Sequence, residues 1–265
     1  MTKKKIVSLC LAAVLVVMAI AGATVAYFTD TDAKTNTFTV GNVKIELIEQ
    51  QRKVVNGEKT TDLKDFEQSK KLYPIVGSVQ GAENLDGIGM PTAKNYVDKM
   101  ITVKNTGSEK AYIRAYFAIP AALDNKDGSA AGNVLHFNDG NRYVKDEKND
   151  GWYSTKDYEW LWGKNSFDAT IKGIKYNVYY ADFYQAVAAG ETTFRFVDGV
   201  YLDKSFDMKH DGAYAFGQKL TLDQGWDWNN VSCPVFAVAC QAEGFDSASE
   251  AITAAFGANY NPWAE

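Results

Sequence analysis

Histidine and cysteine, the residues that most often hold catalytic metals or form cross-links, are scarce in this sequence. Among 265 residues there are two histidines and three cysteines. His136 lies in an expected strand and His210 in an expected loop, and neither belongs to a His-Glu-x-x-His helix. No Gly-x-Ser-x-Gly turn is present, and no cysteine has a histidine beside it. The sequence therefore predicts no catalytic residue, no metal ligand and no enzymatic activity.

The protein is not expected to depend on a disulfide framework. Cys10 lies in an expected signal peptide, so only Cys233 and Cys240 remain in the mature chain. Along an extended strand, a separation of seven residues places two side chains on opposite faces. The spacing favours two small buried core residues and leaves a disulfide open as the alternative.

Basic residues are also fewer than acidic ones. The chain has 28 basic and 33 acidic residues, a formal net charge of −5 at pH 7. We find no basic stripe for nucleic acid and no polybasic segment for an anionic membrane, so neither is expected as a partner. Acidity allows weak calcium binding, but no cofactor is expected. Residues 146–151 begin like a calcium loop, yet Lys148 occupies a ligand position, which indicates a solvated turn.

The N-terminus has the pattern of a secretory signal. Lysines at positions 3–5 precede an apolar run over residues 6–21, and Thr24-Val25-Ala26 offers a cleavage site between Ala26 and Tyr27. We expect residues 1–26 to be the signal peptide and the mature protein to be secreted. The alternative is a retained membrane anchor, because the apolar run is of roughly the length that spans a bilayer.

Strand patterns dominate the rest of the chain. Val43, Ile45 and Leu47 alternate with other residues at a period of two, which predicts a strand with one buried face. Residues 50–71 are charged and weakly patterned, so we expect a loop or a short irregular helix there, with a turn at Asn56-Gly57. Further strands are expected over residues 100–104, 111–117, 135–137, 141–144, 174–183, 193–202, 213–222 and 235–241.

Short strands separated by Gly, Asn and Asp clusters, with only five prolines in the chain, predict an all-β fold. We expect an antiparallel jelly roll or β-sandwich that forms a single domain over residues 50–265. Near the C-terminus, Ser247 and Glu250 have the spacing of a capping box and precede an amphipathic pattern that ends at Gly257. This helix is expected to cover one end or edge of the sheet.

Residues 122–173 are the least regular part and are expected to form an insertion of long loops. The insertion is rich in aromatic residues, including Trp152, Trp160 and Trp162. These rings could stack on sugars or on another subunit, or they could pack the insertion onto the sandwich.

Several blocks resemble the TasA and camelysin family of secreted biofilm-matrix proteins, which a dedicated SipW-type signal peptidase processes. The blocks are Ala26-Tyr27-Phe28-Thr29-Asp30-Thr31-Asp32, Thr37-Phe38-Thr39-Val40-Gly41-Asn42-Val43, Val103-Lys104-Asn105-Thr106-Gly107-Ser108, Tyr112-Ile113-Arg114, Gly190-Glu191-Thr192-Thr193 and Cys240-Gln241-Ala242-Glu243-Gly244-Phe245. Residues 122–173 have no counterpart in this resemblance.

The resemblance implies a jelly-roll subunit that is exported by a Gram-positive bacterium and deposited as fibres in the matrix at the cell surface. Residues 27–49 would then act as a donor strand that completes the sheet of the next copy of the protein. The side chains expected to insert are Phe38, Val40, Val43, Ile45 and Leu47. The alternative is that this segment forms the first strand of its own domain.

Three functions follow as hypotheses. The first is a fibre subunit that assembles with copies of itself and with other matrix proteins or polysaccharide. The second is a monomeric surface adhesin that binds glycans through the aromatic loops. The third is a secreted metalloprotease with an unusual ligand set, because camelysin-type proteins are described as proteases.

Overall fold

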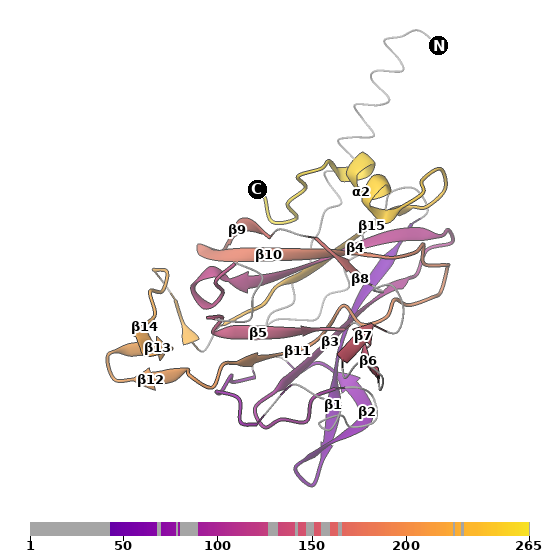
Figure 1. Ribbon diagram of the computed structural model, residues 1–265. Coiled ribbons are helices and arrows are strands. Elements are labelled where there is room, and N and C mark those ends of the chain that lie inside the picture. Colours follow the sequence, from indigo (N-terminus) through magenta and orange to yellow (C-terminus); the bar gives the residue numbers. More distant parts are fainter. Residues whose placement is uncertain are drawn as a thin grey trace.

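The computed structural model describes residues 43–67, 70–77, 79, 90–126, 132–140, 143–146, 151–154, 160–163, 166–224, 226–228 and 231–264, with backbone alone for 143–146 and 151–154. Figure 1 shows two layers of strands with a helix on the outer side of one layer. The elements are β1 (Ile45–Val55), β2 (Glu58–Asp65), β3 (Val97–Asn105), β4 (Ala111–Pro120), the short helix η2 (Ala121–Leu123), β5 (Leu135–Asp139), β6 (Tyr143–Asp146), β7 (Gly151–Ser154), β8 (Trp160–Trp162), β9 (Phe167–Ile171), β10 (Ile174–Phe183), β11 (Val197–Leu202), β12 (Asp207–Lys209), β13 (Gly212–Ala215), β14 (Gln218–Lys219), β15 (Val235–Gln241) and α2 (Ala248–Phe256).

Two antiparallel sheets form the sandwich. The first sheet has the strand order β2-β1-β3-β11-β5, and the second has the order β15-β4-β10-β8, with β9 also paired to β10. Strands β12, β13 and β14 form a small separate sheet, and β6 pairs with β7. The predicted all-β antiparallel sandwich with a C-terminal helix is confirmed. Within the described ranges, no helix is long and apolar enough to cross a membrane.

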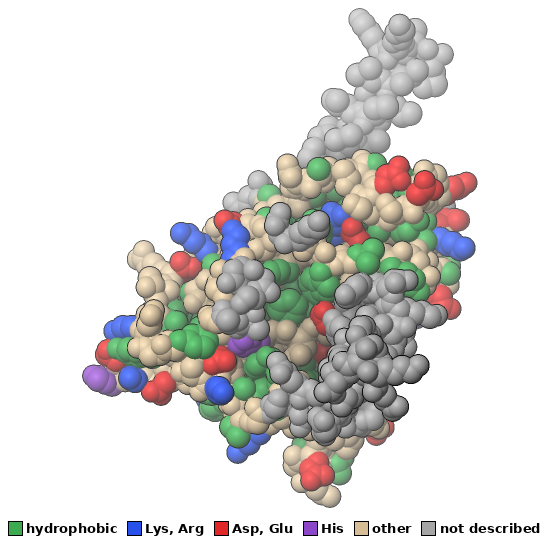
Figure 2. Space-filling view, viewed as in Figure 1, with side chains coloured by type: hydrophobic (Ala, Val, Ile, Leu, Met, Phe, Trp, Pro, Cys, Tyr) green, Lys and Arg blue, Asp and Glu red, His purple; other side chains and the backbone are tan. Residues whose placement is uncertain are grey.

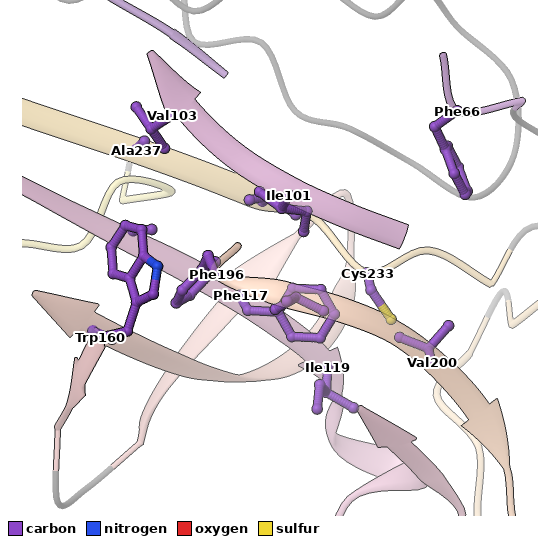
Figure 3. Close-up of a cluster of buried hydrophobic side chains, with 14 of the residues drawn as sticks. Phe66, Ile101, Val103, Phe117, Ile119, Trp160, Phe196, Val200, Cys233 and Ala237 are labelled. Atoms are coloured by element: carbon purple, nitrogen blue, oxygen red, sulfur yellow. The ribbon is translucent and has the colours of Figure 1, made fainter. Parts of the chain in front are cut away.

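The core lies between the two sheets and draws side chains from both. Figure 3 shows buried side chains from both sheets, among them Ile101 of β3, Val200 of β11, Phe117 of β4, Ala237 of β15 and Trp160 of β8. All five side chains are at most 1 % exposed. On the face shown in Figure 2, hydrophobic side chains are visible in a hollow between the two layers.

Strand β4 is buried on both faces, which explains its continuous apolar sequence. Ile113 and Phe117 face the core between the sheets, whereas Tyr112 and Tyr116 belong to a second cluster on the outer face of the second sheet. This outer cluster includes Ile252 of α2. A strand covered on both sides needs apolar residues at successive positions and not at alternate ones.

Helix α2 forms where the capping box predicted it. The Ser247 hydroxyl accepts a hydrogen bond of 3.2 Å from the Glu250 amide, and the Gly257 amide donates one of 2.9 Å to the Thr253 carbonyl. The helix lies over β15, the edge strand of the second sheet, and over its neighbour β4. Its residues Ala248, Ala251 and Ile252 pack on the outer face of the second sheet, because that face is apolar and needs a cover.

The prediction of a loop or irregular helix over residues 50–71 is also wrong. Strands β1 and β2 form a hairpin there, and Asn56 and Gly57 make its turn with φ angles of 53° and 86°. Two positive φ values are typical of the hairpin turn that the Asn-Gly pair predicted. Strand β2 escaped detection because it lies at the edge of the sheet with most side chains exposed or half-buried, so no apolar alternation marks it.

The segment over residues 122–173 is more regular than expected. Its strand β5 completes one edge of the first sheet, and β8 and β9 both pair with β10 in the second sheet. The expected strand at residues 135–137 is confirmed within β5. This segment therefore contributes to both layers of the sandwich.

Candidate functional site

The start of β1 supplies apolar side chains to the core. Val43 and Ile45 are fully buried, and Leu47 packs against the same cluster while partly exposed. The Lys44 carbonyl between them accepts hydrogen bonds from the amides of Thr106 at 2.7 Å and Gly107 at 3.0 Å. In this structure the segment is the first strand of its own domain.

Three of the five predicted donor residues, Val43, Ile45 and Leu47, thus share one face. Phe38 and Val40, together with the expected cleavage site at Ala26 and Tyr27, lie outside the described residues. The assignment of the donor strand stays a prediction.

Strand β1 is held by different partners along its two halves. Residues 45–50 pair with β3, whereas residues 50–55 pair with β2. The two sets of pairs overlap only at Gln50. On the side away from β3, no strand in the described part of the chain pairs with residues 45–48. An unpaired edge presents backbone donors and acceptors that another strand can satisfy.

A buried ion pair marks the second half of β1. Asp98 of β3 accepts hydrogen bonds from Arg52 through its amide at 3.0 Å, Nε at 2.8 Å and Nη2 at 2.6 Å. Lys59 of β2 adds a contact of 2.6 Å from Nζ to Asp98 Oδ1. Burial acts to raise the pKa of Asp98, but the hydrogen bonds from Arg52 and the charge of Lys59 outweigh it and hold this pKa below its usual value. The network fixes the β1–β2 hairpin to β3 through side chains.

A second ion pair joins the first half of β1 to β3. Lys99 Nζ lies 2.6 Å from Glu49 Oε2, and the Lys99 side chain is fully buried. The same ammonium group lies 4.8 Å from the centre of the Phe66 ring. Sequence reasoning missed both ion pairs because the partners are 46 and 50 residues apart and carry no local pattern.

The aromatic residues predicted as a ligand surface are placed differently from one another. Trp160 is fully buried, donates from Nε1 to the Phe194 carbonyl at 2.9 Å, and contacts Phe183 and Phe196 with ring centres 5.1 and 5.0 Å away. Trp162 is partly buried and stacks on Phe196 at 4.8 Å. The side chain of Trp152 lies outside the described residues. Trp160 therefore packs its strand onto the sandwich and presents no face to a sugar.

The two histidines are far apart in the topology and have separate surroundings. His136 of β5 stacks on Tyr201 with ring centres 4.8 Å apart, and its Nε2 lies 3.5 Å from Asp203 Oδ2. Burial lowers the pKa of His136, against the opposing charge of Asp203. His210 is exposed in the turn between β12 and β13.

Cys233 and Cys240 are free buried thiols, as their spacing favoured. Burial raises the pKa of Cys240 to about 11 and that of Cys233 further. Thiols that stay protonated at neutral pH are poor nucleophiles.

Comparison with protein families gives one match. The family model described as camelysin metallo-endopeptidase matches residues 1–76, which confirms the resemblance to the TasA and camelysin family in that part of the chain. The search of curated proteins and the search of solved structures found no match.

The description of that family implies a metal ion. Among the residues whose placement is described, no group of three or more His, Cys, Asp and Glu side chains could hold one. Among the described residues, His136 has one carboxylate within 4 Å, that of Asp203, and its ring stacks on Tyr201. These residues do not fit a metal centre, and we assign no metal-dependent step to them.

Proposed function

We propose that this chain, whose residues 1–76 match the camelysin family model, is a secreted subunit of extracellular fibres in a bacterial biofilm matrix. Residues 27–49 would leave their own domain and pair with β3 of the next subunit. The observation that supports this proposal most is the division of β1, whose first half is bonded to β3 and whose second half is bonded to β2.

Exchange would conserve the contacts that the closed subunit already makes. Val43 and Ile45, both fully buried, would fill the neighbour's core in the way they fill their own. Burying side chains of this size contributes about 1.5–3 kcal/mol each. The net cost of exchange is therefore small, and the concentration of subunits decides between the two states.

The hinge is expected at Gln50, the one residue that pairs with both neighbours of β1. Beyond it the Arg52 contacts to Asp98 hold the β1–β2 hairpin in its own subunit. A contact in which each subunit donates to the next propagates as a filament when the rotation between subunits does not close a ring.

Cleavage between Ala26 and Tyr27 by a SipW-type signal peptidase would release the donor segment. An uncut signal would keep the segment tethered to the membrane and prevent exchange. In this proposal, secretion and assembly are linked by one proteolytic step.

Mixed cysteine cross-linking tests the exchange directly. Ile48 and Thr102 are partners in the β1–β3 register and both are half-buried. Partner Cα atoms in such a pair lie about 4.5–5.5 Å apart, within the range for a disulfide. One preparation carries Ile48→Cys and the other Thr102→Cys, each starting at Tyr27, and the two are mixed before assembly.

If strands exchange, oxidised mixed filaments yield a disulfide-linked dimer on a non-reducing gel. A matched control mixes Val55→Cys with Glu58→Cys, which are partners within the hairpin and should not cross-link between chains. If filaments appear in electron micrographs but the Ile48–Thr102 dimer does not form, strand exchange is contradicted. The proposal that the protein forms fibres would still stand. Monomers only, across salt, acid and calcium, would contradict the fibre itself.

A further inference from the structure

A cationic cavity lies beside the β1–β2 hairpin. Its volume is about 350 Å³, and its wall is built from both strands of the hairpin, from β3 and from residues 70–73. A volume of this size falls within the range of about 300–1,000 Å³ that is typical of small-molecule sites. The charged residues of its wall are Arg52, Lys59, Lys70, Lys71 and Asp98.

The charge of this wall opposes that of the whole protein. Four cations line the cavity beside one acid, although the chain as a whole has a net charge of −5. That acid, Asp98, is already bonded to Arg52 and Lys59. The described wall of the cavity therefore carries more positive than negative charge.

The ammonium groups of Lys70 and Lys71 supply most of this excess. Among the described residues, neither donates a hydrogen bond or forms an ion pair within 4 Å, although the charges of Glu67 and Asp98 attract Lys70, which also lies 5.8 Å from the centre of the Phe66 ring. Burial lowers the pKa of Lys70 and of Lys59, as expected for cations that lose part of their hydration. An anion in the cavity would restore those lost interactions.

The remaining wall is apolar and partly open. Tyr73 and Val54 line the cavity with 55 % and 58 % of their surfaces exposed. An exposed aromatic ring next to cations suits a ligand that combines a negative charge with an apolar face. A sugar ring that carries a carboxylate has both properties, whereas a phosphate ion or a glutamate side chain has no such face.

We propose that this cavity binds an acidic sugar residue, that is, a uronate unit of an anionic polysaccharide. The carboxylate would lie among Lys59, Lys70 and Lys71, and the sugar ring would stack on Tyr73. The site differs in place and in ligand charge from the tryptophan-rich segment, and it does not depend on fibre formation.

Isothermal titration calorimetry of the mature chain with tri-galacturonate tests the site. Three variants are compared with the parent: Lys70→Gln with Lys71→Gln, Tyr73→Ala, and a control pair of exposed lysines elsewhere, Lys110→Gln with Lys175→Gln. Both lysine pairs remove the same charge, so they separate a local site from general attraction.

We expect the cavity lysine pair to weaken binding at least tenfold and Tyr73→Ala to weaken it several-fold, with the control pair close to the parent. Equal loss in the two lysine pairs, or no heat with tri-galacturonate at 50 mM salt, would overturn the proposal. Maltotriose, inorganic phosphate and a tetraglutamate peptide complete the test. Equal or tighter binding of any of them would overturn the assignment to an acidic sugar.

Discussion

The buried pair Arg52–Asp98 of the first sheet and the buried pair Arg114–Asp182 of the second sheet differ in their surroundings. In the first sheet, Asp98 is shared between Arg52 and Lys59 beside a cationic cavity. In the second sheet, Arg114 Nε and Nη2 bind the two oxygens of Asp182 at 2.6 and 2.9 Å, and the Tyr180 ring lies 4.7 Å from the guanidinium.

The elements that pack on the outer faces of the two sheets also differ. The second sheet is closed on its outer face by α2 and by aromatic residues near the C-terminus, with Trp263 and Tyr260 packed against Tyr116. Figure 1 shows α2 on the outer side of that layer and the β1–β2 hairpin at the opposite end of the molecule. The second sheet is covered on its outer face, and the first sheet holds the features on which the proposals of assembly and ligand binding rest.

The largest loss of unfolding free energy is expected when Asp98, the acid of the Arg52–Asp98 pair, is removed. Asp98→Ala leaves Arg52, which is 1 % exposed, without its carboxylate, and removing one partner of a buried pair costs about 4 kcal/mol of unfolding free energy. Asp182→Ala should cost less, because Asp182 accepts two hydrogen bonds and Asp98 accepts four. Urea unfolding at pH 7 measures both losses.

The pH dependence gives a check on the same pair. The folded-state pKa of Asp98 lies below 3.8, so its contribution is present above pH 3.8 and is lost as the pH falls through the folded value. The gap between the parent and Asp98→Ala should therefore narrow below pH 3.8. A loss for Asp182→Ala that equals or exceeds that for Asp98→Ala would contradict the comparison.

The next largest loss of unfolding free energy is expected in α2, the helix that covers the second sheet. Ile252 of α2 is fully buried against that sheet, so Ile252→Ala should lower the unfolding free energy by about 3 kcal/mol. Thr253→Ala, at an exposed position of the same helix, is the control and should change it by less than about 0.5 kcal/mol. Similar values for the two variants would mean that the helix does not stabilise the sheet.

Sequence patterns predicted most strands of both sheets and missed β2 in the first sheet and β8 and β9 in the second. The alternating and continuous apolar runs of β4, β10 and β15 carry their own signal, and the Ser247 capping box marks α2 within four residues. In the first sheet, the charged sequence of β2 looked like a loop because an edge strand needs no apolar face.

The candidate sites depend on contacts that no local pattern contains. Lys99 is fully buried, and its ammonium group lies 2.6 Å from the carboxylate of Glu49, 50 residues away in sequence. The cationic cavity likewise joins Arg52, Lys59 and Lys70 only after the hairpin has formed. The apolar residues at the start of β1 were predictable from their period of two, because their partner is the common core.

A smaller loss of unfolding free energy is expected at the N-terminus of α2. Ser247 accepts a hydrogen bond from the Glu250 amide, and replacing an N-cap serine by alanine costs about 1 kcal/mol. Thermal and urea unfolding of Ser247→Ala measure this loss. Ser249→Ala, which is exposed within the first turn, serves as the control, and an equal loss in the control would contradict the capping role.

The smallest expected change in unfolding free energy comes from the titration of His136 on β5, the edge strand of the first sheet. Burial holds its pKa below 6.5, so the folded protein keeps the ring neutral while the unfolded chain binds a proton as the pH falls below 6.5. Its contribution to stability is therefore present above pH 6.5 and is lost as the pH falls through the folded-state pKa. His136→Phe keeps a ring against Tyr201 and removes the titration. Between pH 7 and pH 5 the parent should lose stability relative to His136→Phe, as measured by urea unfolding at each pH. A difference that stays constant over this range would show that the fold does not discriminate between the two protonation states of His136.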